Sequence, residues 1–263
     1  MRPQTSSSEF DRGRDDPRGI LADRLARAPA DYLEGALRNP ALDEDLVVLM
    51  LRNRAAPGAL IERIARDERY RGSHEVRAGL VSHPASPRGV AMNLVHLLYW
   101  RDLARAADDP RVPPPVRRVA VRVLESRMEE MTLGERIALA RAAGRSVILA
   151  LRRSREPRVV EALLDNPRIV EEDAVFLASR TDVPADVLGA LARSRRWSPR
   201  YPVRLALVHN ERSPVGIVLG LLTGLLRRDL EGLLVSHGGP PVIRFAAERV
   251  LRARAGARGR RAL

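Results

Sequence analysis

Apolar residues recur along this chain at helical spacing, in short segments that follow proline-containing turns. After the Asn39-Pro40 turn, Leu46, Leu49 and Met50 fall on one face of a predicted helix. Pro57, Pro87 and Pro114 stand at the first turn of further segments of this kind. There is no sustained apolar–polar alternation, and no Asn-Gly or Asp-Gly pair that would indicate a hairpin. The pattern therefore predicts an all-α protein built from short helices.

The sequence also repeats itself at an offset of 127 residues. Residues Glu34–Leu124 align without a gap onto Glu161–Leu251, with 29 identities in 91 positions. The stretch SPRGVAMNLVHLLYWRDL (86–103) is thus the counterpart of SPVGIVLGLLTGLLRRDL (213–230). This similarity predicts two tandem homologous halves.

Short helices cannot bury their apolar faces alone, but they form a continuous core when each packs on its neighbours. We therefore expect a right-handed α-solenoid of the HEAT, armadillo or leucine-rich-repeat-variant type. A capping-box pattern at Thr132 and Glu135 predicts a helix between the halves. The expected organisation is a disordered segment (1–18), a first half (19–127), a connecting helix (128–147), a second half (148–254) and a disordered basic tail (255–263).

Several segments resemble the repeat units of known families. These are DDPRVPPPVRRVAVRVL, HEVRAGLVSHPASP and YPVRLALVHNERSP, which share an Asp/Asn-Pro turn or a Val-Arg pair followed by Ala or Leu at helical spacing. They are similar to HEAT-like and leucine-rich-repeat-variant proteins of bacteria. The resemblance implies an armadillo-type fold and protein binding. The cysteine cluster of some variant-repeat proteins cannot be transferred, because this chain has no Cys.

Charge adds a second possibility. The formal net charge is +13, and all 46 basic residues are Arg. Such an excess suits a nucleic acid or another anionic partner, although a GC-rich genome also favours Arg over Lys. The beginning of the chain has no signal-peptide pattern, and the longest apolar run, Val215–Leu226, is too short to span a bilayer. We therefore expect a cytoplasmic protein without membrane insertion.

The best candidate for nucleic-acid binding is the segment RSRRWSPRYPVR (193–204). It interleaves cations for phosphates with aromatic rings that could stack on bases, namely Arg193, Arg195, Arg196, Trp197, Arg200 and Tyr201. The equivalent segment of the first half, 66–77, keeps an aromatic residue, Tyr70, but adds three acidic residues. This difference favours an aromatic residue packed between helices, with an optional basic rim.

A second set of charged residues occurs in both halves: Arg77 and Arg204, Asp102 and Asp229, Arg117 and Arg244. Residues kept in both copies of a repeat usually serve packing, which the copies share. We therefore expect a structural ladder in which Arg side chains bond carboxylates and helix C-terminal carbonyls. A binding surface is the alternative interpretation.

Catalytic patterns are missing from the sequence. No HxxxH or HExxH spacing, G-x-S-x-G elbow or phosphate-binding loop is present. We expect no catalytic residue, metal site or cofactor, and a non-enzymatic scaffold that binds a protein. Nucleic-acid binding through 193–204 and the basic tail is the alternative. A third hypothesis, from the resemblance, is a HEAT-like DNA glycosylase with Asp102 beside Trp100.

Overall fold

The computed structural model describes residues 8–235 and 240–259, with side chains described as far as residue 255. These residues form eighteen α-helices and one 3₁₀ turn, with no strand among them, which confirms the all-α prediction. The chain divides into two compact units, Met1–Glu130 and Met131–Leu263.

The first unit contains nine of the described helices. They are α1 (Glu9–Asp15), α2 (Arg18–Arg24), α3 (Ala30–Ala36), α4 (Glu44–Met50), α5 (Gly58–Arg66), α6 (His74–Ser82), α7 (Arg88–Val95), α8 (Trp100–Asp108) and α9 (Pro114–Arg127). The 3₁₀ turn, Glu68–Tyr70, lies between α5 and α6.

The second unit repeats this order in its described part. Its helices are α10 (Leu133–Ala142), α11 (Arg145–Leu151), α12 (Pro157–Leu164), α13 (Glu171–Ser179), α14 (Ala185–Arg193), α15 (Tyr201–His209), α16 (Val215–Leu222), α17 (Arg227–Val235) and α18 (Pro241–Gly259). At the offset of 127 residues, α2–α9 correspond one by one to α11–α18.

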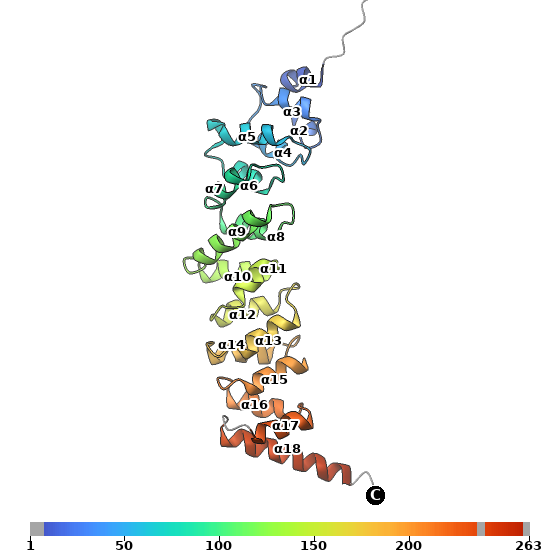
Figure 1. Cartoon of the computed structure of the whole chain (residues 1–263), viewed down its shortest axis with the longest axis vertical. Coiled ribbons are helices and arrows are strands. Elements are labelled where there is room, and N and C mark those ends of the chain that lie inside the picture. Colours follow the sequence, from blue (N-terminus) through green and yellow to red (C-terminus); the bar gives the residue numbers. More distant parts are fainter. Residues whose placement is uncertain (1–7, 236–239, 260–263) are drawn as a thin grey trace, which may run out of the picture. The chain divides into compact units, whose positions relative to one another are not determined.

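Within each unit, many helices pack on the second helix along the chain, which produces rows, while others, such as α8 and α17, pack most on the next helix (Figure 1). In the first unit α2, α4, α6 and α8 form one such row, while α1 packs on α3 and α7 on α9. In the second unit α10, α12 and α14 form a row, α13 packs on α15, and α16 on α18. Neighbouring helices such as α6 and α7, or α15 and α16, join the rows.

The predicted helix starts are confirmed at several prolines. Pro57 and Pro87 are the N-caps of α5 and α7, and Pro114 is the first residue of α9. The apolar face predicted for α5 is also confirmed, because Leu60 and Ile61 are fully buried and Ile64 is nearly so. Apolar burial between the rows thus forms the core of each unit.

The predicted disordered ends are wrong where the structure describes them. Residues 9–15 form α1, which Ser8 caps by accepting a hydrogen bond from the Asp11 N–H at 3.1 Å. This helix is stable because it packs on α3, a contact the local sequence does not reveal. At the other end α18 continues to Gly259, since Ala and Arg favour helix. Residues 260–263 of the predicted tail lie outside the described residues.

The region predicted as one connecting helix, 128–147, contains α10 and the start of α11. The capping box is confirmed, since Thr132 Oγ1 accepts from the Glu135 N–H and the Glu135 carboxylate accepts from the Thr132 N–H. However, α10 packs on α12 as α1 packs on α3. It is therefore an integral helix of the second unit. The relation between α10 and α1 is visible in their packing and not in their sequences.

Buried polar side chains in several turns donate hydrogen bonds to backbone carbonyls of the preceding turn. We call these side chains turn donors. Asn53 Nδ2 donates to the carbonyls of Leu25 and Ala28 at 3.0 and 2.8 Å, and its Oδ1 accepts from the Ala55 N–H. Asn39, Asn166 and Asn210 make equivalent sets of bonds. These bonds satisfy carbonyls at helix ends that have no partner within their own helix.

The role of a turn donor is preserved even where the residue changes. His83 Nε2 bonds the Asn53 carbonyl at 3.0 Å, while its Nδ1 accepts from the Ala85 N–H, which requires the neutral tautomer protonated at Nε2. Arg180, equivalent to Asn53, donates to the carbonyls of Arg152 and Ser154 at 3.0 Å each. The duplication has therefore conserved a donor at this place and not a residue type.

We expect Asn166→Ala to destabilise the protein by about 2 kcal/mol, because it leaves two buried carbonyls without their donor. Asn166→Asp should cost more at neutral pH, since a carboxylate would then face both carbonyl oxygens. The midpoint of urea unfolding, followed by circular dichroism, measures both effects. The exposed Asn93 on α7 is the matched control, and its Ala variant should change the midpoint little. An equal shift for Asn93 and Asn166 would contradict this role.

Candidate functional site

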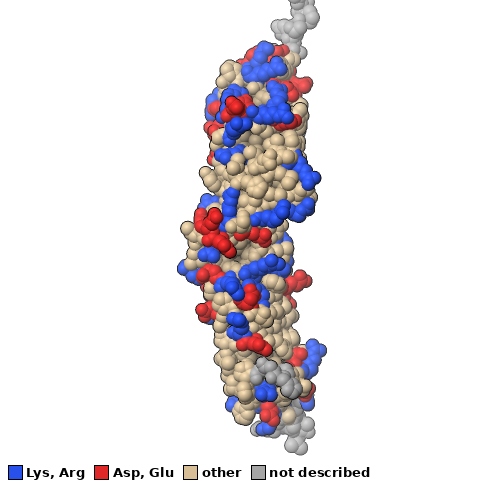
Figure 2. Space-filling view, turned by 60° about the vertical axis from the view of Figure 1, so that its left-hand side comes forward, with Lys and Arg blue, Asp and Glu red and all other residues tan. Residues whose placement is uncertain are grey.

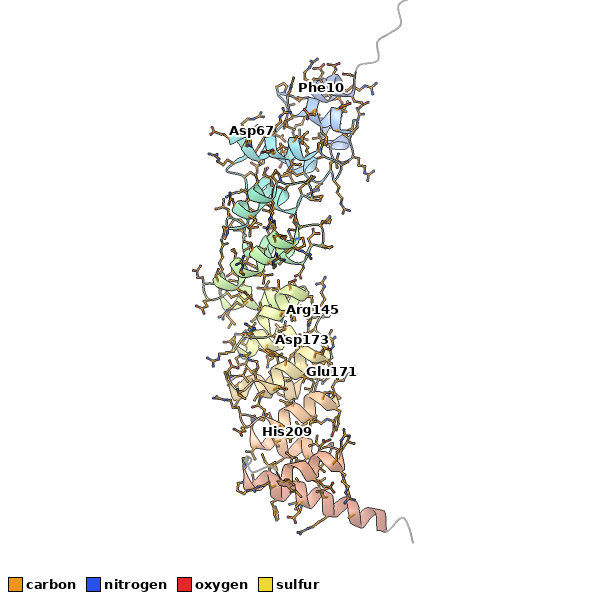
Figure 3. All side chains as sticks on the ribbon, in the orientation of Figure 1. Phe10, Asp67, Arg145, Glu171, Asp173 and His209 are labelled. Carbon is orange, nitrogen blue, oxygen red and sulfur yellow. The ribbon has the colours of Figure 1, made fainter. Side chains whose placement is uncertain are left out.

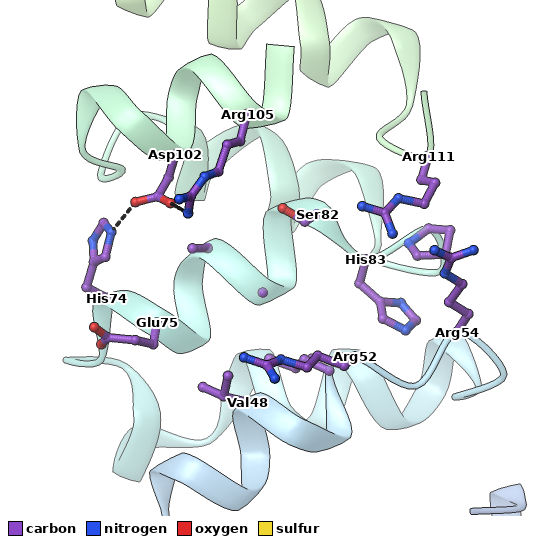
Figure 4. A pocket seen from close by; sticks show the side chains of 14 residues that line it. Val48, Arg52, Arg54, His74, Glu75, Ser82, His83, Asp102, Arg105 and Arg111 are labelled. Carbon is purple, nitrogen blue, oxygen red and sulfur yellow. Dashed lines mark hydrogen bonds and ion pairs between the residues drawn. The ribbon is translucent and has the colours of Figure 1, made fainter. Parts of the chain in front are cut away.

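The first unit has a hollow of about 540 Å³ on the row formed by α4, α6 and α8 (Figure 4). We call this hollow the basic groove. Its walls come from α4 and the following turn, and from α8 and the following turn, while α6 forms its floor. The residues that line it include Arg52, Arg54, His74, Glu75, Ala78, Gly79, Ser82, His83, Asp102, Arg105 and Arg111.

Small side chains on α6 create the hollow. Ala78, Gly79 and Ser82 line its floor, so α6 does not fill the space between its neighbours. A Cβ atom at Gly79 would lie 2.8 Å from Leu51 Cδ1, so glycine allows this close approach of α6 without a shift of the Leu51 side chain. The groove thus results from residue size along a single helix.

Four arginines line the groove, and Figure 4 shows Arg54 and Arg111 at one end and Arg105 beside Asp102 at the other. Arg105 Nη1 lies 3.3 Å from Asp102 Oδ1, and Arg111 bonds Asp109, with Nε 2.7 Å from Oδ1. Hydrogen bonds from Arg111 hold the pKa of Asp109 below its ordinary range. Arg52 and Arg54 are exposed, and within the described part of the chain neither makes an ion pair or side-chain hydrogen bond. The guanidinium groups of Arg52 and Arg54 therefore have donors available beside the groove.

The opposite end of the groove is acidic (Figure 4). His74 Nε2 lies 2.7 Å from Asp102 Oδ2, and its ring stacks on Tyr99 with centroids 3.9 Å apart. Glu75 is exposed beside this pair. One end of the groove therefore holds the carboxylates of Glu75 and Asp102, with Arg105 bonded to Asp102, and the other end holds the guanidinium groups of Arg54 and Arg111.

The second unit lacks the cations of the groove. At the equivalent positions it has Ser179, Thr181 and Gly232 in place of Arg52, Arg54 and Arg105. The floor differs as well, because the counterpart of Ala78 is the larger Leu205. Since both units share the same helix order, these arginines are not required by the packing that the copies have in common.

The pair at the acidic end is conserved in a modified form. Tyr201, the counterpart of His74, donates from its hydroxyl to Asp229, and this hydroxyl accepts from the Leu226 N–H at 3.0 Å. Burial and the bond to Asp229 raise the pKa of Tyr201. Asp102 and Asp229 thus lie in the first turns of α8 and α17, where they bond α6 and α15 respectively.

The predicted Arg–Asp ladder is not formed as expected. Arg77 donates to the carbonyls of Ser73 and Gly72, at the start of its own helix, because its guanidinium folds back along α6. Arg204 bonds the Pro199 carbonyl in the same way and also reaches the carbonyl of Gly224 after α16.

The other two arginines of that ladder do not supply the missing pairs. The Nε of Arg117 is buried without a hydrogen-bond partner among the described residues. No ion pair joins Arg117 or Arg244 to Asp102 or Asp229 in the described part of the chain. Asp102 instead bonds His74 of α6, and Asp229 accepts a hydrogen bond from Tyr201 of α15.

The aromatic residues of the 193–204 segment are structural. Trp197 is only 4% exposed, and its Nε1 donates to the Leu164 carbonyl at 3.0 Å. Arg196 lies over the indole ring at 4.4 Å and donates to the carbonyls of Asn166 and Ile169. The hypothesis of base stacking on Trp197 is therefore wrong, since the ring is already packed between helices.

The remaining cations of that segment are dispersed. Arg193 and Arg200 face Glu161 and Glu171 at 3.4 and 3.8 Å, whereas Arg195 is exposed. The face drawn in Figure 2 shows basic side chains in separate groups with acidic side chains between them. On that face the basic side chains do not form the continuous stripe expected of a phosphate-tracking surface.

The glycosylase hypothesis rested on Asp102 and Trp100. Asp102 is bonded by both His74 and Arg105. The guanidinium of Arg101 lies over the Trp100 ring, 5.1 Å from its centroid. Both candidate groups therefore already have partners within the first unit.

A buried ion cluster distinguishes the second unit (Figure 3). Asp173 on α13 is fully buried and forms ion pairs with Arg145 of α11 and with Arg152, the C-cap residue of α11. It also accepts from the Val170 N–H at 3.1 Å, and Arg152 stacks on Phe176 at 4.1 Å. Burial alone would raise the pKa of Asp173, but the bonds from Arg145 and the Val170 N–H, with the Arg charges, lower it below its ordinary value.

The first unit has an apolar cluster at the equivalent place. Its residues there are Leu25, Leu46 and Leu49, where the second unit has Arg152, Asp173 and Phe176. The shared fold therefore does not require the ion cluster. It is a replacement of core residues by a charged set in one copy.

No group of three His, Cys, Asp or Glu side chains that could hold a metal ion occurs among the described residues. None of the described helices combines the length and the apolar character needed to cross a bilayer. No protein-family model, curated protein or solved structure matches this chain. Functional inference therefore depends on the groove and on the differences between the two units.

Sequence reasoning missed both the turn donors and the basic groove. The turn donors were hidden because Asn, His and Arg replace one another at these places. The groove could have been found by listing Arg residues that lack an Arg counterpart 127 positions away, which include Arg52, Arg54 and Arg105. Their approach to one another around α6 still required the structure.

Proposed function

We propose that this protein is a non-enzymatic, right-handed α-solenoid of the HEAT-like or leucine-rich-repeat-variant type that binds another protein. Stacked rows of short helices and turn donors at successive turns support the solenoid assignment. The observation that supports binding is the basic groove, because its cations belong to one copy of a duplicated fold. Its exposed, uncommitted side chains are free to contact a partner.

A protein fits the groove better than a nucleic acid does. In the 193–204 segment, Trp197 is buried between helices and Tyr201 bonds Asp229. The groove lining also includes the carboxylates of Glu75 and Asp102. A polypeptide can present opposite charges to the two ends of the groove, whereas a phosphodiester backbone presents only negative charge. The function needs no cofactor or catalytic residue.

Site-specific photo-cross-linking tests this function. A benzophenone amino acid at Ser82, within the groove, should capture a defined polypeptide from an extract of the source organism. The second unit has the larger His209 at the equivalent position, so a bulky residue is compatible with the fold. The same probe at Arg88, which is exposed on α7, is the control. Mass spectrometry should identify the captured protein, and the purified partner should cross-link again.

Equal labelling from Ser82 and Arg88, or no product from Ser82, would refute a protein-binding groove. Cross-linking to nucleic acid in place of protein would support the alternative function. These outcomes are separated by treating the product with protease or nuclease before electrophoresis.

A further inference from the structure

We infer that the basic groove binds an acidic stretch of its partner, with partner carboxylates held by Arg52 and Arg54. This inference rests on the proposed function and adds the chemistry of the bound segment. It predicts an extended polypeptide with several Asp or Glu side chains that contact Arg52 and Arg54 along the groove.

The first argument is the state of the four arginines. Arg111 already uses Nε and Nη2 on Asp109, and Arg105 contacts Asp102. Arg52 and Arg54 follow α4 and are separated by the buried turn donor Asn53. Neither makes an ion pair or a side-chain hydrogen bond with an acidic residue in the described part of the chain, although the charge of Arg54 also lowers the pKa of Asp109. A carboxylate from outside can form bidentate bonds with such groups, which makes it the matching ligand.

The second argument comes from the anchored backbone beneath these arginines. Asn53 bonds the Leu25 and Ala28 carbonyls, and His83 bonds the Asn53 carbonyl from the next turn. The main chain between Arg52 and Arg54 is therefore fixed on both sides. A fixed backbone lowers the entropic cost of holding the two guanidinium groups against a ligand.

The third argument excludes a site built for stacked bases. The aromatic rings of the lining are the imidazoles of His74 and His83. His74 is covered by Tyr99 and bonded to Asp102, while His83 is 1% exposed. His83 therefore offers no face for stacking, and one face of His74 is already stacked on Tyr99. Recognition there must come from charge and from side chains small enough to enter the hollow over Ala78 and Gly79.

Fluorescence anisotropy with defined probes tests this inference on the full-length protein. The probe is a fluorescein-labelled ten-residue peptide of alternating Glu and Ala, and the control peptide has Gln in place of Glu. A labelled ten-nucleotide single-stranded DNA is the third probe. We expect the Glu peptide to bind, the Gln peptide to bind at least about tenfold more weakly, and salt to weaken the binding.

Two variants connect this binding to the groove. Arg52→Gln/Arg54→Gln should weaken binding of the Glu peptide by about tenfold or more. The matched control is Arg88→Gln/Arg118→Gln, which removes the same charge from exposed positions on α7 and α9. It should change the affinity by less than about twofold, because surface charges at a distance are screened by salt.

A third variant tests the hollow without changing charge. Ala78→Leu introduces the residue that the second unit has at this position, so the fold should tolerate it. Circular dichroism and the thermal midpoint verify folding of every variant. We expect Ala78→Leu to weaken peptide binding severalfold, because the side chain would occupy the floor of the groove.

Three results would overturn the inference. Equal losses in the two Arg double variants would show non-specific charge attraction. Binding of the DNA with the same dependence on Arg52 and Arg54 would assign the groove to nucleic acid. No binding of the Glu peptide, with a protein still cross-linked from Ser82, would refute the acidic segment but leave the proposed function intact. Failure of both experiments would reject both proposals.

Discussion

Asp173→Ala should destabilise the protein by about 3–5 kcal/mol, the largest single effect expected here. Asp173 is fully buried, and its carboxylate bonds two Arg side chains and the Val170 N–H. Its removal leaves Arg152, whose side chain is 24% exposed, without its counter-ion. The free energy of unfolding from urea denaturation is the measurement.

The first unit supplies a rescue variant for this prediction. Asp173→Leu/Arg152→Leu/Phe176→Leu reproduces Leu46, Leu25 and Leu49 of the first unit. Replacing a buried ion cluster by packed apolar residues is often neutral or stabilising. The triple variant should therefore recover most of the stability lost by Asp173→Ala. A triple variant as unstable as Asp173→Ala would show that the loss has another cause.

The same cluster predicts a pH dependence. The pKa of Asp173 is lower in the folded protein than in the unfolded chain, so its ionised form stabilises the fold. This contribution is complete above the unfolded pKa, about 4, and is lost as the pH falls through the folded pKa. Wild type should lose stability over this acidic range more steeply than the triple Leu variant. Parallel curves would contradict the assignment.

Gly35→Ala should destabilise the first unit by about 2–3 kcal/mol, through overpacking where α1 crosses α3. A Cβ at Gly35 would lie 1.9 Å from the Phe10 carbonyl oxygen, and one at Gly13 would lie 2.1 Å from the Tyr32 carbonyl oxygen. Both obstacles are backbone atoms, which cannot move aside as a side chain can. Thermal unfolding followed by circular dichroism should show the lower midpoint, with Gly13→Ala behaving alike.

The control for this prediction is Gly89→Ala on α7. A Cβ at Gly89 would meet no atom within 4 Å. Because Ala favours helix over Gly, this variant should leave the midpoint unchanged or raise it slightly, by up to about 1 kcal/mol of stability. A loss at Gly89 as large as at Gly35 would indicate a general requirement for glycine and not a close helix crossing.

Much of the helical organisation follows from local sequence. Pro57 and Pro87 lack the backbone N–H that a helix interior needs. Each therefore lies just before a helix, α5 or α7. Leu60 and Ile61 are buried because helical spacing places them on one face. The duplication could also be recognised from the sequence, since equivalent positions such as Asn39 and Asn166 carry the same residue in both copies.

The candidate site was much less predictable. The segment containing Trp197 had the composition of a nucleic-acid site, yet the ring is buried against the preceding helices of its own unit. Arg52 and Arg105 are 53 positions apart in the chain and gave no joint signal. Their shared groove depends on the small side chain of Ala78 between them. The spacing of residues along the sequence does not show that Ala78 lies between these two arginines.

By itself, the sequence determined the all-α class, the duplication and the main helix starts, because these depend on residues close together or on identities between copies. The tertiary structure alone decided that α1 is a packed helix, that Asp102 pairs with His74, and that unduplicated arginines surround a hollow. The physical reason is that helix formation depends on local backbone and side-chain preferences. The partners of a charged side chain depend on which helices are brought together by packing.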